Sequence, residues 1–175
     1  MLLDLSSVMS EQHKDIIQDV RIDMEAFALE GRSYPVLEKS PASLHISHVK
    51  EKKYRITGKA RLVFETFCDR CLEPVETEMI LDFVKNVDLS VPDAEQSDEL
   101  DESNYIDGYT LDVDKLICNE VLIGWPTKIL CSEDCKGICN VCGQNLNQGT
   151  CNCEDTSLDP RMSVIRDVFK NFKEV

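Results

Sequence analysis

Two extended segments joined by a tight turn are predicted within residues 53–89, which read KYRITGKARLVFETFCDRCLEPVETEMILDFVKNVDL. In residues 53–67, apolar side chains recur at every second position, which is typical of a strand with one buried face. Gly58, in the middle of this segment, predicts a bulge or a bend. Residues 68–74 form the predicted turn, and extended structure resumes over residues 75–89. The stretch therefore predicts two long antiparallel strands.

Shorter elements are predicted on both sides of these strands. Alternating apolar and polar residues predict strands at residues 19–26 and 44–49. An apolar stripe after a capping aspartate predicts a helix over residues 112–124, and a second helix is predicted to begin at Asp159. Short antiparallel strands with two helices are typical of an α+β fold, either a curved antiparallel sheet or a small, partly open β-barrel.

Six of the nine cysteines lie within residues 131–153, CSEDCKGICNVCGQNLNQGTCNC. Zinc takes four ligands in a tetrahedron, and thiolate is one of its preferred ligands. The Cys139-Asn-Val-Cys142-Gly turn allows two sulfurs to converge on one ion. We expect a structural zinc, because a catalytic zinc leaves a position open for water and usually involves His or a carboxylate. The expected ligands are Cys131, Cys135, Cys139 and Cys142, with Cys151 and Cys153 as alternates.

A second Cys-x-x-Cys turn, Cys68-Asp69-Arg70-Cys71, allows three interpretations. It can be a redox dithiol, although no thioredoxin-like βαβ pattern surrounds it. It can supply two ligands to a zinc that it shares with Cys139 and Cys142. The interpretation we favour is a tight functional turn between two strands, in which Arg70 makes a specific contact.

A basic stretch runs against the acidic character of the chain. Its alternation places four side chains on one face of the predicted strand 53–67, namely Lys53, Arg55, Lys59 and Arg61. This face is either the solvated outside of a sheet or a local contact with RNA phosphates. No aromatic stacking platform accompanies it, so an RNA-recognition sheet is not supported.

The composition limits the possible partners and locations. A net charge of −14 repels bare nucleic acid, so we expect no DNA partner and at most a weak or indirect RNA contact. No apolar run approaches the roughly 18–20 residues that span a bilayer. The opening MLLDLSSVMS has no basic lead-in, and we therefore expect a cytoplasmic protein without a membrane association.

No pattern in the sequence indicates catalysis. We find no Gly-rich phosphate loop, no plausible Ser-His-Asp arrangement and no paired carboxylates in an apolar setting. We therefore expect neither an enzyme nor a small-molecule substrate. The predicted organisation is an α+β core domain over residues 1–126, with an acidic loop at 92–107. Residues 127–175 are expected to form the zinc-binding loop and a closing helix that packs on the core.

Several segments together resemble the YceD family of large ribosomal RNA subunit accumulation proteins. They are the opening LLDLSS at residues 2–7, FCDRCLEPV at 67–75, the cysteine segment LCSEDCKGICNVCGQNLNQGTCNCE at 130–154 and LDPRMSVIRDV at 158–168. The resemblance implies a bacterial, non-enzymatic role in the synthesis, processing or stability of large-subunit (23S) ribosomal RNA. The expected partner is a basic ribosomal protein or a large-subunit precursor.

The resemblance also bears on the metal. Many members lack the C-terminal cysteines, which implies that the zinc is a local brace. Two alternative functions stay open: a thiol-disulfide oxidoreductase that uses Cys68 and Cys71, and a purely structural zinc protein.

Overall fold

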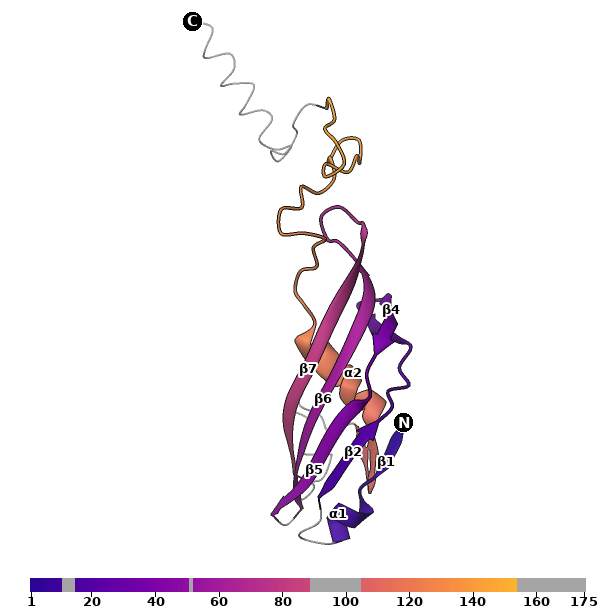
Figure 1. The fold of residues 1–175 in the computed structure, drawn as a ribbon, viewed down its shortest axis with the longest axis vertical. Helices are drawn as coiled ribbons and strands as arrows, with labels where there is room; N and C mark the ends of the chain where they lie inside the picture. Colours follow the sequence, from indigo (N-terminus) through magenta and orange to yellow (C-terminus); the bar gives the residue numbers. More distant parts are fainter. Residues whose placement is uncertain (11–14, 51, 89–104, 154–175) are drawn as a thin grey trace, which may run out of the picture. The chain divides into compact units, whose positions relative to one another are not determined.

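The computed structural model describes residues 1–10, 15–50, 52–88 and 105–153 (Figure 1). These residues form two compact units. The first unit comprises Met1–Thr66 and Glu76–Thr127. The second comprises Phe67–Val75 and the described part of Lys128–Val175. The Cys68–Cys71 turn, which lies inside the core domain predicted from the sequence, thus belongs with the C-terminal cysteines.

The first unit is built on a six-stranded sheet in the order β2-β5-β6-β4-β3, with β7 also paired to β6. The central strand β6 runs antiparallel to β5 through its first half and to β4 through its second half. Over the described residues the sheet does not close into a barrel, and its antiparallel strands with two helices agree with the predicted α+β class. The strands are β2 (Ile16–Val20), β3 (Ala26–Leu29), β4 (Arg32–Lys39), β5 (Ala42–Lys50), β6 (Lys53–Phe67) and β7 (Pro74–Asp88).

A smaller antiparallel sheet completes the first unit, together with two helices. Its strand order is β1-β9-β8, with β1 at Leu2–Asp4, β8 at Ile106–Asp107 and β9 at Thr110–Asp112. The helices are α1 (Ser6–Ser10) and α2 (Val113–Gly124). The side chain of Asp112 caps α2 by accepting the N–H of Lys115 at 3.3 Å, as the sequence predicts.

The core of the first unit lies between the sheet and α2. Leu116, Ile117 and Val121 of α2 are fully buried in one cluster with residues from every strand of the larger sheet except β4. Strand β4 contributes partly buried side chains that pack against this cluster. Trp125, directly after α2, lies 4.9 Å from the Phe27 ring and 4.8 Å from the Tyr34 ring. The aromatic contacts fix the end of the helix over β3 and β4.

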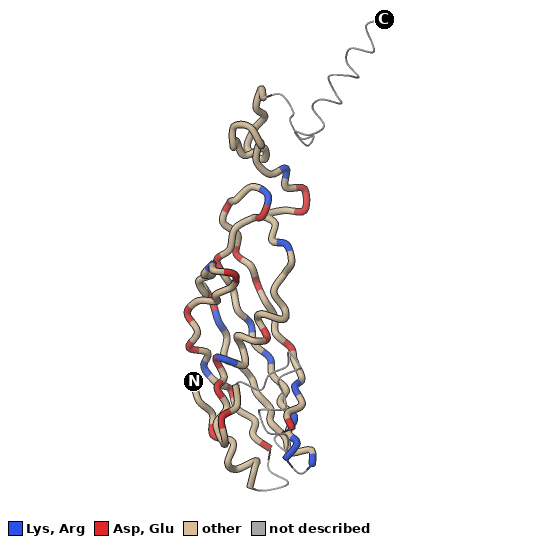
Figure 2. Tube along the Cα trace, turned by 180° about the vertical axis from the view of Figure 1, so that it is seen from behind, with Lys and Arg blue, Asp and Glu red and all other residues tan. Residues whose placement is uncertain are grey.

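Strand β6 alternates between buried and exposed residues over most of its length, as expected for a strand that covers a core on one face. Its exposed face carries the four basic residues predicted from the sequence. Figure 2 shows Lys and Arg interleaved with Asp and Glu along the paired strands. The outer face of the sheet is therefore mixed in charge.

Gly58 of β6 does not mark a bulge in the pairing with β5, which continues from Ser43↔Lys59 through Leu44↔Gly58. The glycine instead accommodates the Phe83 ring of β7. A Cβ atom at this position would lie 2.3 Å from Cζ of Phe83, far inside van der Waals contact. Of the predicted bulge or bend, the bulge was wrong, because close packing of an aromatic ring also requires glycine.

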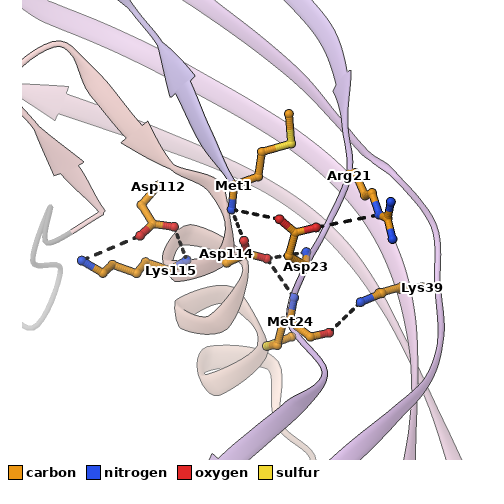
Figure 3. A network of polar contacts seen from close by, with 8 residues as sticks. All are labelled: Met1, Arg21, Asp23, Met24, Lys39, Asp112, Asp114 and Lys115. Atoms are coloured by element: carbon orange, nitrogen blue, oxygen red, sulfur yellow. Dashed lines mark hydrogen bonds and ion pairs between the residues drawn. The ribbon is translucent and has the colours of Figure 1, made fainter.

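The strand predicted at residues 19–26 is interrupted in the structure. Strand β2 ends at Val20 and β3 begins at Ala26. Between them, the Asp114 carboxylate of α2 accepts the N–H groups of Asp23 at 2.7 Å and of Met24 at 3.0 Å (Figure 3). These backbone donors therefore bond to a helix side chain instead of to a neighbouring strand.

The same carboxylate forms an ion pair with the N-terminal ammonium of Met1 (Figure 3). Burial opposes ionisation of Asp114, but the bonds from the ammonium group and the two N–H groups outweigh it and lower the pKa of this carboxyl. Asp114 thus ties the N-terminus and the 21–25 segment to the first turn of α2.

Two predictions concern segments that the structure does not describe in full. Most of the acidic loop at 92–107 and the whole of the helix predicted from Asp159 lie outside the described residues. Within the described part of the chain, no helix is long and apolar enough to cross a membrane.

Candidate metal centres

All nine cysteines lie in the described residues and are free thiols. Eight of them form two groups, and the ligand atoms within each group all lie within 4.8 Å of one another. The first group is Cys68, Cys71, Cys131 and Cys135, and the second group is Cys139, Cys142, Cys151 and Cys153. Both groups belong to the second unit. The ninth thiol, Cys118, lies on α2 in the first unit.

Sulfur spacing in the first group fits a tetrahedral ion better than a disulfide. The Sγ atoms of Cys68 and Cys135 are 3.7 Å apart, and those of Cys71 and Cys131 are 3.5 Å apart. A disulfide requires about 2.05 Å. Four thiolates at about 2.3 Å from a zinc ion lie about 3.8 Å from one another. Each group can therefore hold a metal ion.

The two Cys-x-x-Cys turns share one backbone hydrogen-bond pattern. In the first turn, Cys68 N–H donates to the carbonyl of Glu73 at 2.8 Å, and Leu72 N–H donates to that of Cys68 at 2.9 Å. In the second turn, Cys139 N–H donates to the carbonyl of Gln144 at 2.8 Å. Gly143 N–H donates to the carbonyl of Cys139 at 2.9 Å, which completes the match.

The residue after each second cysteine has a left-handed backbone, with φ of 61° at Leu72 and 75° at Gly143. Glycine adopts this conformation freely, whereas leucine pays about 1–2 kcal/mol for it. The first turn thus takes the same left-handed shape as the second, although this shape is unfavourable for its leucine. A shared shape that directs two sulfurs to one point is the local geometry of a metal-binding turn.

Several contacts fix the first group between segments that are distant in sequence. Asp69 N–H donates to the carbonyl of Ile129 at 2.8 Å, and Ile129 N–H donates to the Asp69 carboxylate at 2.6 Å. The Arg70 guanidinium donates to the carbonyl of Cys135 at 2.8 Å. The sequence predicts a specific contact for Arg70, and in the structure Arg70 contacts the backbone of Cys135, a member of the first group.

Gly137 allows the chain to pass close to this turn. Its φ is 79°, and a Cβ atom there would lie 3.1 Å from the carbonyl oxygen of Arg70. A larger residue would be strained and would press on the Arg70 backbone. The glycine thus permits the two segments of the first group to approach.

Asn147 is a residue of this site that the sequence analysis missed. Its side-chain N–H donates to Sγ of Cys135 at 3.3 Å, and its carbonyl oxygen accepts Lys136 N–H at 2.8 Å. Such a group orients a ligand sulfur and disperses its negative charge. The Asn-rich character of residues 144–148 is the only sequence signal that pointed to it.

Backbone N–H groups favour ionisation of the first thiol of each Cys-x-x-Cys turn. Burial opposes ionisation of Cys68, yet the N–H groups of Cys71, Cys131 and Arg70 lower the pKa of its thiol to about 6. For Cys139, the N–H groups of Cys142 and Val141 lower the pKa to about 6. Metal binding requires thiolates, so the first thiol of each turn is the one that these N–H groups prepare for a cation.

Exposure differs between the two groups. In the first group, Cys68 is 0%, Cys135 3% and Cys71 5% exposed, while Cys131 is exposed. These three buried thiols form a small apolar cluster with Val75, Leu130 and Ile138 packed against it. In the second group, Cys142 is exposed and the other three thiols are partly exposed. The first group is therefore better shielded from solvent.

The observed grouping differs from the ligand set expected from the sequence. Cys131 and Cys135 lie with Cys68 and Cys71, while Cys139 and Cys142 lie with the two alternates, Cys151 and Cys153. One interpretation of the Cys68–Cys71 turn placed it in a shared site with Cys139 and Cys142. In the structure these two pairs belong to different groups.

The basic side chains of β6 are engaged with acidic neighbours. Lys53 pairs with Asp88 at 2.8 Å and Lys59 pairs with Asp82 at 2.9 Å, both on β7. Arg61 pairs with Glu38 of β4 at 2.9 Å and also with Glu78 of β7. Arg55 donates to the side-chain oxygen of Asn86 at 3.3 Å. The face is exposed as predicted, but its cations are not a free phosphate-binding row.

Comparison with known proteins adds a family. The model of the family described as large ribosomal RNA subunit accumulation protein YceD matches residues 56–169, which is more than half of the chain and includes both cysteine groups. No curated protein matches the chain, and no solved structure does.

Proposed function

Because the chain belongs to the YceD family, whose name links it to accumulation of the large ribosomal RNA subunit, we propose that it is a non-enzymatic factor in ribosome biogenesis. It supports the synthesis, processing or stability of large-subunit ribosomal RNA. The family match over residues 56–169 is the observation that carries this proposal.

The proposed partner is a basic ribosomal protein, or a large-subunit precursor that carries such proteins. The net charge of −14 favours a basic partner over bare RNA, because phosphate binding depends on available Lys and Arg side chains. The β6 cations are shared with carboxylates on neighbouring strands, and those carboxylates repel phosphate. Exposed ion pairs contribute little to stability, so phosphate can replace these carboxylates at little cost. We propose that such RNA contacts are secondary to binding of the basic partner.

The proposed cofactor is zinc in a structural role. Four thiolates complete a tetrahedral shell and leave no position for water or substrate. Metal bound in this way contributes folding free energy to a segment with a small core of its own. The small apolar cluster around Cys68, Cys71 and Cys135 supports this role.

The proposal is tested by copurification with the tagged full-length chain from a lysate of its own cells. We expect large-subunit precursors and their ribosomal proteins to accompany it, and deletion to lower mature large-subunit RNA relative to small-subunit RNA. A Lys53→Ala, Lys59→Ala variant is the matched control and should copurify normally if RNA contact is secondary. No copurification, together with unchanged precursor and mature RNA levels after deletion, would refute the proposal.

A thiol oxidoreductase at Cys68 and Cys71 is less well supported. Disulfide exchange requires an accessible thiolate, whereas Cys68 is 0% exposed. Insulin reduction by the zinc-loaded protein measures this activity, and turnover that is lost in Cys68→Ser would favour it. A purely structural zinc protein would bind zinc and show no ribosomal partner.

A further inference from the structure

We infer that the chain binds two zinc ions, one in each four-cysteine group, and that the second group releases its ion before the first. This inference rests on the zinc assignment proposed above and not on the ribosomal role. It adds the number of ions, the ligands of each ion and the order of release.

Each of the two cysteine groups is complete on its own. Each supplies four sulfurs within 4.8 Å of one another, which is the number of ligands that a tetrahedral zinc ion needs. Neither group needs a ligand from the other. A single ion bound by Cys131, Cys135, Cys139 and Cys142 would divide both groups and leave four thiols without a common centre.

The two Cys-x-x-Cys turns are equivalent in their backbone geometry. The Cys68 and Cys139 turns have the same pair of backbone hydrogen bonds and the same left-handed residue after the second cysteine. At Leu72 this conformation is unfavourable for the side chain that occupies it. If the second turn binds a metal, the first has the same geometry to do so.

The sulfurs of the two groups are unequally shielded from solvent. A chelator removes zinc by displacing thiolates that solvent can reach. In the first group only Cys131 is exposed, and Asn147 and the apolar cluster cover the side of Cys135. In the second group Cys142 is exposed, and Cys151 and Cys153 are partly exposed. A chelator can therefore reach the sulfurs of the second group more easily, and we expect the second group to release its zinc sooner.

The two groups also differ in how far apart in the sequence their cysteines lie. The first group joins two segments that lie 60 residues apart, from Cys71 to Cys131, and these segments are also tied by Asp69 and Ile129. The second group lies within residues 139–153. Opening the first site requires the separation of two hydrogen-bonded segments, whereas opening the second requires only local movement of one loop.

The experiment uses the full-length zinc-loaded protein and three variants. Zinc per chain is measured by elemental analysis for the wild type, Cys68→Ser with Cys71→Ser, Cys139→Ser with Cys142→Ser, and the control Cys118→Ser. We expect two ions in the wild type and the control, and one in each double variant. A colorimetric zinc chelator should remove the wild-type zinc in two phases of equal amplitude. The fast phase should be absent from the Cys139, Cys142 variant.

Labelling of the wild-type protein keeps the inference testable if a double variant fails to fold. The protein is alkylated while zinc is removed, and the labelled cysteines are identified by mass spectrometry. Loss of the zinc that leaves first should coincide with labelling of Cys142, Cys151 and Cys153 of the second group. Labelling of Cys68, Cys71 and Cys135 should come later. One zinc per wild-type chain, or earlier labelling of the first group, would overturn the inference. Two ions without ribosomal copurification would refute the proposed function alone, and copurification with a single ion would refute this inference alone.

Discussion

Replacing Gly58 by alanine is expected to destabilise the first unit through the Phe83 ring. The new Cβ atom would lie 2.3 Å from Cζ and 2.7 and 2.8 Å from the two Cε atoms of that ring. Ordinary carbon contacts are about 3.5 Å or longer, so the ring must move by about 1 Å. Phe83 is only 8% exposed and belongs to the core, so the movement displaces other packed side chains.

The magnitude follows from two opposing effects. Overpacking a well-packed core costs about 1–3 kcal/mol. Alanine recovers about 0.5–1 kcal/mol, because glycine loses more backbone freedom than alanine when it is fixed in a strand. The middle of each range, about 2 kcal/mol against about 0.75 kcal/mol, gives an expected net loss in the free energy of unfolding of about 1 kcal/mol for Gly58→Ala.

The assay is urea denaturation followed by fluorescence of Trp125, the single tryptophan, which packs against Phe27 and Tyr34 in the same unit. A double-mutant cycle with Phe83→Leu separates the ring contact from backbone effects. The cost of Gly58→Ala should fall when the ring is absent. Equal or greater stability of Gly58→Ala, or additive effects in the cycle, would show that the reasoning is wrong.

Three further perturbations test other contacts. Asp114→Ala should lower unfolding free energy at neutral pH by about 1–2 kcal/mol, since it removes the acceptor of two backbone N–H groups. Because the pKa of Asp114 is lowered on folding, its contribution is present above pH about 4 and disappears as pH falls through the folded pKa. Denaturation between pH 7 and 3 should therefore show the two proteins converging, and parallel curves would contradict this. Lys85 and Glu120 form a largely buried ion pair at 3.1 Å, so Glu120→Ala should cost about 3 kcal/mol, whereas the double replacement by apolar residues should cost much less. Asn147→Ala should speed zinc release from the first group about tenfold, with exposed Gln18→Ala of the first unit as the control, and equal chelation rates would argue against a role for Asn147 at Cys135.

The elements with a strong local signal were predictable. Alternation identified β6 at Lys53–Phe67, and the capping aspartate with its apolar stripe identified α2. Both follow from side-chain periodicity and from hydrogen bonds between near neighbours. The interruption between β2 and β3 was not predictable, because the acceptor that ends the strand is Asp114, about 90 residues away.

On the basic face of β6, too, one feature was predictable from the sequence and another depended on the tertiary structure. The two-residue period places Lys53, Lys59 and Arg61 on an exposed face. Their partners depend on which strands lie beside β6 and in which register, and that information is tertiary. The ion pairs with β7 and β4 therefore changed an apparent phosphate-binding row into a paired surface.

By itself the sequence determined that this chain contains two Cys-x-x-Cys turns, each of which can direct two sulfurs to one point, because such a turn is built from residues that are near neighbours in the chain. It did not determine which turns share an ion. Proximity in the chain favoured Cys131 and Cys135 as the partners of Cys139 and Cys142, but loop-closure entropy rises by only about 0.6 kcal/mol for each doubling of loop length. So small a difference cannot choose between partners, and the choice falls to the tertiary contacts of Asp69 with Ile129 and of Arg70 with Cys135.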